Sequence, residues 1–151
     1  MRKLVFTAIL ALTLLAACNK SEPCQYSEVF TSALPAEITQ IEAYLAGEGI
    51  TDAVEHSSGV FYRIVSVGTG AGAGSLCNTV NLIFSGYRFN VTTPFDSFTG
   101  AEGLPLVLGQ TILGFQKCIP LVKTGGTITL YIPPSFAYGN RAITDANGNV
   151  V

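Results

Sequence analysis

The chain has 151 residues, of which 48% are apolar and 12% charged, with 8 Lys and Arg against 10 Asp and Glu. Domains commonly contain about 100–200 residues, so this length predicts one folded domain with extra segments. The high apolar content and low net charge exclude disorder over most of the chain. The longest basic run is Arg2-Lys3. Because phosphate neutralisation needs a concentrated basic face, we expect no nucleic-acid partner.

Residues 1–17 have the pattern of a lipoprotein signal peptide. A basic start precedes an apolar run over residues 4–17, which is too short to span a bilayer comfortably. The run ends in Leu-Ala-Ala-Cys, which resembles the bacterial lipobox, so we expect lipidation at Cys18; an ordinary secretory signal is the alternative. Asn19 favours the outer membrane, by resemblance to known sorting rules. The expected location is the cell envelope, with the membrane contacted through the N-terminal lipid.

Export would place the remaining cysteines in an oxidising compartment, where disulfides persist. With Cys18 lipidated, these are Cys24, Cys77 and Cys118. We favour a Cys77–Cys118 disulfide because both residues fall inside the expected folded region, whereas Cys24 lies near the lipid; free or merely buried thiols are the alternative. No pair has metal-ligand spacing, and the one histidine, His56, is far from each cysteine in the sequence. We therefore expect no metal site.

Residues 19–31 are polar and predict a spacer, which lies within the expected lipidated tether of residues 18–34. Residues 35–46 begin with proline and carry apolar side chains at helical spacing, so they predict an amphipathic helix. This helix could cap a sheet edge or serve as a stalk. With its connector, it forms the expected N-terminal unit of residues 35–58.

From residue 59 onward, the pattern becomes that of short strands with irregular connections. Strands are expected over residues 60–65, 80–89 and 127–132, a further apolar piece over 104–108, and a short helix over 112–119. The glycine-rich run 68–74 is expected to be a turn, because it lacks the lysine and the helix of a phosphate-binding loop. Short strands outnumber helices, so the predicted fold class is α+β with an antiparallel sheet.

Nucleophilic catalysis needs a base beside a nucleophile, and the sequence has no such motif. Six aromatic residues stand out instead, because they lie beside Gly, Pro and Asp in turns: Phe84, Phe95, Phe98, Phe115, Phe136 and Tyr138. In a small domain, each aromatic residue taken alone is more often part of the core. Their placement in turns favours a binding groove.

Five motifs follow one another in the second half of the chain. They are Leu-Ile-Phe-Ser-Gly at 82–86, Pro-Phe-Asp-Ser at 94–97, Gln-Thr-Ile-Leu-Gly-Phe at 110–115, Gly-Gly at 125–126, and Tyr-Ile-Pro-Pro-Ser-Phe-Ala-Tyr-Gly at 131–139. In order and spacing they resemble the motifs of FKBP-type peptidyl-prolyl cis/trans isomerases, over roughly residues 60–141. The resemblance implies an antiparallel half-barrel sheet wrapped on a short helix, with a proline pocket between them.

The resemblance also implies the apolar lining of that pocket. Phe115 takes the position of its floor, where the family usually has Trp. Phe84 and Phe95 take the positions of its walls, Phe84 standing where many members have Tyr. Phe136 lies on the last loop and is included among the substrate-binding residues, although packing is the more plausible role.

Three further positions carry the polar roles of the family. Asp96 is its polar wall group, the Ile112 backbone N–H donates to a substrate carbonyl, and the Tyr138 phenol donates to another. The catalytic set expected from the resemblance is Asp96, Tyr138 and Phe95. We expect reduced rather than absent activity, because phenylalanines at positions 84 and 115 lack a hydroxyl and an indole N–H.

The expected function is isomerisation of X–Pro bonds during the folding of exported proteins, whose proline-containing segments are the expected partners. No cofactor is expected. A non-catalytic peptide-binding or chaperone lipoprotein is the alternative. Family members continue into a further apolar strand in the middle of the sheet, whereas this sequence stops at Val151. We therefore expect the domain of residues 59–151 to be C-terminally incomplete or completed by a neighbouring segment, with residues 80–89 and 127–132 facing an unpaired gap.

Overall fold

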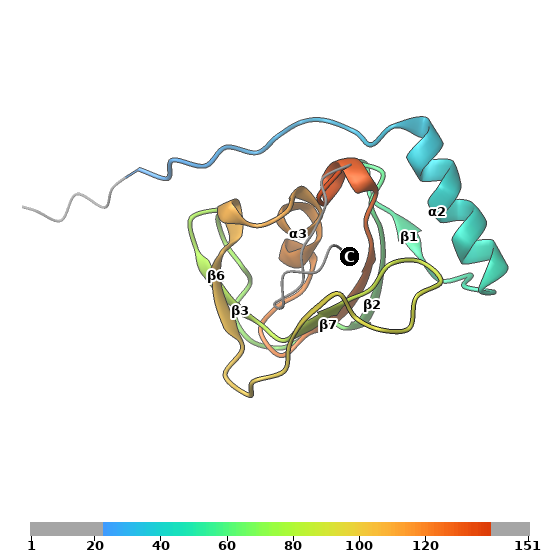
Figure 1. The fold of residues 1–151 in the computed structure, drawn as a ribbon. Coiled ribbons are helices and arrows are strands. Elements are labelled where there is room, and N and C mark those ends of the chain that lie inside the picture. Colours follow the sequence, from blue (N-terminus) through green and yellow to red (C-terminus); the bar gives the residue numbers. More distant parts are fainter. Residues whose placement is uncertain (1–22, 140–151) are drawn as a thin grey trace, which may run out of the picture.

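Antiparallel strands curve around a short helix in residues 23–139, the part of the chain that the computed structural model describes (Figure 1). The expected signal peptide, Cys18 and residues 140–151 lie outside these described residues. The antiparallel pairs are β1 (Val54–Glu55) with β2 (Phe61–Ser66), β2 with β7 (Thr127–Tyr131), β3 (Thr79–Leu82) with β6 (Leu104–Val107), and β4 (Phe84–Gly86) with β5 (Asp96–Phe98). The central helix is α3 (Leu113–Cys118). The predicted α+β class with antiparallel pairing is therefore confirmed.

The strand predicted over residues 80–89 is divided into β3 and β4 at Ile83. The two halves take different partners, because β3 pairs with β6 whereas β4 pairs with β5. Ile83 between them is 60% exposed. The change of partner therefore turns the chain at this residue and begins the separate β4–β5 hairpin.

Within residues 23–139, β2 alone is paired on both sides, and the other six strands each keep an unpaired edge. Among these six are β7, β3 and β4. They lie in the segments 127–132 and 80–89, which we expect from the sequence to face a gap.

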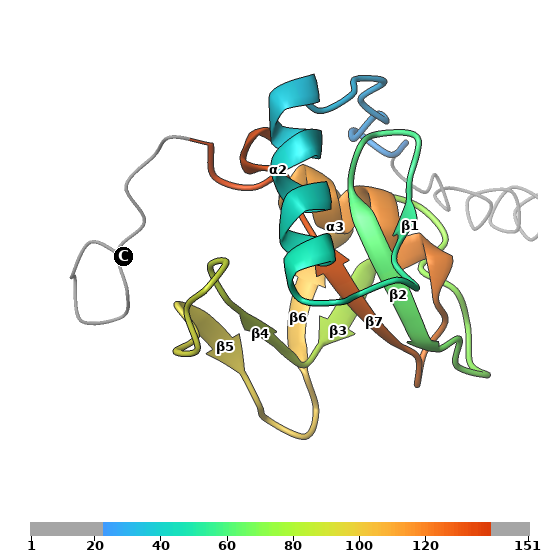
Figure 2. The same cartoon turned by 90° about the vertical axis from the view of Figure 1, so that its right-hand side faces the viewer.

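Helix α2 (Pro35–Gly47) matches the predicted helix and extends it by one residue. Its Ile41 and Leu45 side chains are buried against Phe61 of β2 and Tyr131 of β7. The helix therefore packs on the sheet (Figure 2), and about 1.5–3 kcal/mol for each buried aliphatic side chain favours this position over a free stalk. Among the described residues, no helix has the length and apolar character needed to cross a membrane.

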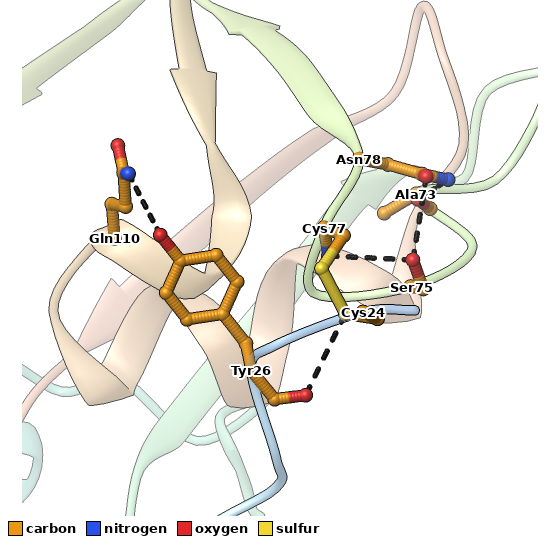
Figure 3. Close-up of a disulfide and its surroundings, with 7 residues drawn as sticks. All are labelled: Cys24, Tyr26, Ala73, Ser75, Cys77, Asn78 and Gln110. Carbon is orange, nitrogen blue, oxygen red and sulfur yellow. Dashed lines mark hydrogen bonds between the residues drawn. A yellow bond between two sulfur atoms is a disulfide. The ribbon is translucent and has the colours of Figure 1, made fainter. Parts of the chain in front are cut away.

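The predicted Cys77–Cys118 disulfide is wrong, because the bond joins Cys24 to Cys77 (Figure 3). Cys118 lies on α3 in the core beside Val60 and Phe136 and is fully buried. Burial raises the pKa of its thiol to about 12, so Cys118 stays a neutral, unreactive thiol at physiological pH. Cys24 instead lies beside the turn that carries Cys77, with the two Cα atoms 5.6 Å apart.

The described part of the expected tether, residues 23–34, lies along the domain. Besides the disulfide, the Tyr26 side chain contacts the segment before α3, and Ala33 is buried in the core. The Ala33 N–H donates to the Ser58 carbonyl oxygen at 2.8 Å. This segment is therefore held at both ends.

Candidate functional site

One face of the β4–β5 hairpin brings two aromatic rings of the predicted site together. Phe84 and Gly86 are two residues apart on β4, so their Cβ directions share a face of the hairpin. The Phe95 ring lies over Gly86 on that face, 3.0 Å from the position that a Cβ would occupy. A side chain at position 86 would therefore force the Phe95 ring to shift. Phe84 and Phe95 therefore share this face.

Each of these rings meets a ring from another part of the chain. Phe84 contacts Phe115 of α3 edge to face, with ring centroids 6.2 Å apart and planes at 78°. Phe95 contacts Tyr138 in the same manner, at 6.1 Å and 87°. All three phenylalanines are half-buried, and Tyr138 is 38% exposed. The predicted pocket aromatics therefore assemble in two pairs along the hairpin, partly open to solvent.

A cleft of about 610 Å³ lies between the segment before α3 and the loop after β7, and of the four paired rings only Tyr138 lines it. Its lining includes Ile112 on one side and Tyr138 on the other. Ile112 is the N-cap of α3, and its carbonyl oxygen accepts from Phe115 N–H at 3.0 Å. Among the described residues, no group accepts a hydrogen bond from the Ile112 N–H. A bound peptide carbonyl could therefore take this donor.

The segment before α3 is braced from two sides. Gln116 of α3 donates through Nε2 to the Thr111 carbonyl oxygen at 2.7 Å. Tyr26 packs on Gly109, where a Cβ would overlap its ring, and its phenolic oxygen accepts from Gln110 Nε2 at 2.7 Å (Figure 3). The disulfide fixes Cys24 two residues from Tyr26, so it helps to hold the N-terminal segment against this wall of the cleft.

The polar groups of the site are Asp96 and Tyr138. Asp96 begins β5 directly after Phe95 and is exposed. Burial, and then the negative charge of Asp96, raise the pKa of the Tyr138 phenol above its ordinary value near 10. The phenol therefore stays protonated at neutral pH and remains a hydrogen-bond donor.

Phe136 is corrected from a substrate-binding residue to a core residue. Its side chain is 2% exposed and packs with Val60 and Cys118. It belongs to the short 3-10 helix η4 (Pro134–Phe136), in which successive side chains point in different directions. The sequence places Phe136 and Tyr138 on one loop, but only Tyr138 faces the cleft.

Sequence reasoning assigned no role to three polar side chains that line the cleft. These are Gln110, Thr111 and Ser135. Their position could have indicated a role, because they lie beside Ile112 and Phe136 inside the motifs at 110–115 and 131–139. In the described part of the chain, no three His, Cys, Asp or Glu side chains are grouped so that they could hold a metal ion.

Comparisons with known proteins point to one family. The family model described as FKBP-type peptidyl-prolyl cis-trans isomerase matches residues 74–149, half of the 151-residue chain. The protein FkpA of Buchnera aphidicola (subspecies Schizaphis graminum) is 30% identical over 95 residues, which cover 63% of this chain and 38% of that protein. The outer membrane protein MIP of Legionella longbeachae is 34% identical over 88 residues, which cover 57% of this chain and 36% of that protein.

A solved structure shares the fold. The crystal structure of FkpA from Escherichia coli superimposes with a TM-score of 0.58 at 28% identity, covering 68% of this chain and 47% of that chain. The matched region spans 38% of the Buchnera protein and 36% of the Legionella protein.

Proposed function

Because the chain belongs to the FKBP-type peptidyl-prolyl cis-trans isomerase family, we propose that it accelerates the cis/trans isomerisation of X–Pro peptide bonds. The observation that carries the proposal is the pairing of Phe84 with Phe115 and of Phe95 with Tyr138, together with an open cleft that Tyr138 lines. The substrates are proline-containing segments of exported proteins.

The apolar rings supply the larger part of the proposed rate enhancement. Rotation about an X–Pro bond passes over a barrier of about 18–20 kcal/mol because the amide loses its resonance when it twists. The twisted amide is less dipolar than the planar one. A dry aromatic surface therefore disfavours the planar ground state relative to the transition state. If the pocket lowers the barrier by about 5 kcal/mol, the rate rises by somewhat under four orders of magnitude.

Hydrogen bonds supply the orientation. The Ile112 N–H and the Tyr138 hydroxyl lie on opposite sides of the cleft. Together they can hold two carbonyl groups of the peptide that flank the proline and so fix it in a turn. Asp96 lies at the exposed edge of the site, where it favours the neutral phenol of Tyr138. No step requires a nucleophile or a cofactor.

The proposal includes a place in the cell envelope. The lipobox-like sequence before Cys18 supports anchoring through an N-terminal lipid. A relative whose name is outer membrane protein MIP supports the outer membrane as the location. An anchored domain would meet exported chains as they fold. Mass spectrometry of the membrane-extracted protein tests this part, because an unmodified Cys18 would contradict it.

The function is tested by following the isomerisation of an X–Pro peptide with the purified protein in a protease-coupled assay. We expect the rate constant to rise in proportion to protein concentration. Peptide binding measured on the same sample separates the two candidate functions. Binding without acceleration would support a peptide-binding or chaperone module, and the absence of both would contradict either function.

The substitution Tyr138→Phe is expected to lower kcat/KM about three- to tenfold, because one hydrogen bond contributes about 0.5–1.5 kcal/mol. The ring and its contact with Phe95 remain, so stability changes little. The deficit is expected to be constant from about pH 6 to pH 9, since the raised pKa keeps the wild-type phenol protonated there. Above that pKa the phenolate no longer donates, and the wild-type rate falls toward the variant's. Equal rates at pH 7 would contradict the assigned role.

A further inference from the structure

Helix α2 contacts both loops that border the candidate site. In its first turn, the Glu37 carboxylate accepts hydrogen bonds from the Ser135 N–H, at 3.0 Å, and from the Ser135 hydroxyl. Ser135 lines the cleft, three residues before Tyr138. Glu37 therefore holds the loop that carries the phenol.

Near the other end of α2, Tyr44 holds the opposite side of the site. Its ring stacks on Phe89, with centroids 4.1 Å apart and planes at 7°. Phe89 belongs to the connection between β4 and β5, the hairpin that carries Phe84 and Phe95. The Tyr44 ring also contacts Tyr131 of β7 at 6.3 Å, which fixes it on the sheet. Tyr44 therefore links this hairpin to the core.

The spacing along α2 suits both contacts. Glu37 and Tyr44 are seven residues apart, so they lie on one side of the helix about 10 Å apart along its axis. Ile41 and Leu45 fix the same helix on the β2–β7 sheet. Figures 1 and 2 show η4 near the start of α2 and the β4–β5 connection near its end. One rigid element therefore spans the two sides of the site.

We propose that α2 is a clamp that sets the distance between the β4–β5 hairpin and the Ser135–Tyr138 loop, with Glu37 and Tyr44 as positioning residues. This inference rests on the proposed function, and neither residue touches the peptide. Each acts through a loop whose own residues form the site. Loss of either contact frees one wall, so that Phe95 and Tyr138 meet the substrate less often in the productive arrangement.

The test begins with two substitutions at position 44, one that removes the aromatic ring and one that keeps it. Tyr44→Ala removes the stacked ring and is expected to lower kcat/KM about two- to tenfold, the range that corresponds to one aromatic pair. We expect the change mainly in KM, because the chemistry of the rings is unaltered. Tyr44→Phe keeps the ring stacked on Phe89 and is expected to retain the wild-type kcat/KM. Glu37→Ala should lower kcat/KM similarly, while Glu37→Gln, which keeps an acceptor for Ser135 N–H, should lower it less.

The matched control is Glu42→Ala, on the exposed surface of the same helix. Its kcat/KM is expected to equal that of the wild type. Any effect of Tyr44→Ala beyond this control then reflects the loss of the Tyr44 ring, which contacts Phe89 and Tyr131. Equal kcat/KM in Tyr44→Ala and Glu42→Ala would overturn the clamp.

Hydrogen exchange gives a readout that does not depend on activity. The Phe95 N–H donates to Gly86 O inside the hairpin, and the Gly139 N–H donates to Pro134 O in the second loop. Tyr44→Ala is expected to accelerate exchange of the Phe95 N–H more than exchange in β2 and β7. Glu37→Ala is expected to accelerate exchange of the Gly139 N–H more than exchange in the same two strands. Uniform acceleration would overturn the proposal by showing a merely structural role. An inactive wild type with these local patterns would contradict the proposed function and leave the clamp supported.

Discussion

Removing the disulfide by the paired substitution Cys24→Ser and Cys77→Ser is expected to lower the free energy of unfolding by about 4 kcal/mol. The two cysteines are 53 residues apart in the sequence. On the chain-entropy model, a closed loop of this length restricts the unfolded state by about 4 kcal/mol. Small domains are stable by only about 5–15 kcal/mol in total, so the loss is a large fraction of the whole.

The measurement is a denaturant titration followed by circular dichroism, with the wild type titrated with and without reductant. Reduced wild type and the double-serine variant are expected to unfold at the same denaturant concentration. In the folded protein the buried Cys118 thiol has a pKa raised to about 12 and stays unreactive; unfolding exposes it, so the titrations are made at a pH well below the ordinary thiol pKa of about 8.5, where exchange with the disulfide is slow. Coincident transitions for oxidised wild type and the variant would show that the Cys24–Cys77 bond does not stabilise the fold.

The same bond is coupled to the site through Tyr26. The ring packs on Gly109 and its phenolic oxygen accepts from Gln110, at the wall that carries Ile112. Without the disulfide, the tyrosine is held only by these weaker contacts. Oxidation or reduction of this disulfide is therefore expected to change both the free energy of unfolding and the shape of the cleft. Activity is to be compared only between samples in the same redox state.

The cysteine pairing could not be predicted because polarity does not distinguish a free tether from a segment that lies along a domain. Residues 23–34 carry polar side chains such as Gln25 and Glu28, yet Ala33 is buried and Tyr26 is packed. Both contacts are made with residues far away in the sequence, such as the pairing of Tyr26 with Gln110 over 84 positions. No local pattern reports such contacts. The assumption that Cys24 belongs to a tether therefore led to the wrong partner.

The aromatic residues of the candidate site could be predicted from the sequence, whereas the contacts that hold them in place could not. Phe84, Phe95, Phe115 and Tyr138 lie in motifs with characteristic spacing, and the structure brings their rings together. Phe136 was misplaced because a 3-10 turn changes the direction of each successive side chain, which the motif alone does not reveal. The bonds of Glu37 to Ser135, over 98 positions, have no signature in the sequence at all. Helix α2 was accordingly predicted as an element, but not as part of the site.

Phe115→Ala is expected to have the largest effect on activity, lowering kcat/KM about 10- to 100-fold. The ring meets Phe84 edge to face at the floor of the proposed pocket. Burial of a phenylalanine side chain contributes about 1.5–3 kcal/mol, and its loss admits water beside the proline. Each 1.36 kcal/mol of lost transition-state stabilisation is a factor of ten in rate. A wetter floor also stabilises the planar, dipolar amide, so kcat is expected to fall together with kcat/KM.

Two further variants separate this role from stability. Phe115→Trp keeps an apolar ring and adds an N–H, so we expect it to retain at least the wild-type rate. Phe30→Ala removes a ring that is 90% exposed and lies outside the cleft, and it should leave the rate unchanged. All rates are compared well below the midpoint of thermal unfolding, because Phe115→Ala also destabilises α3. A Phe115→Ala protein that is folded and fully active would show that the Phe84–Phe115 surface does not receive the proline, and the isomerase site would have to lie elsewhere.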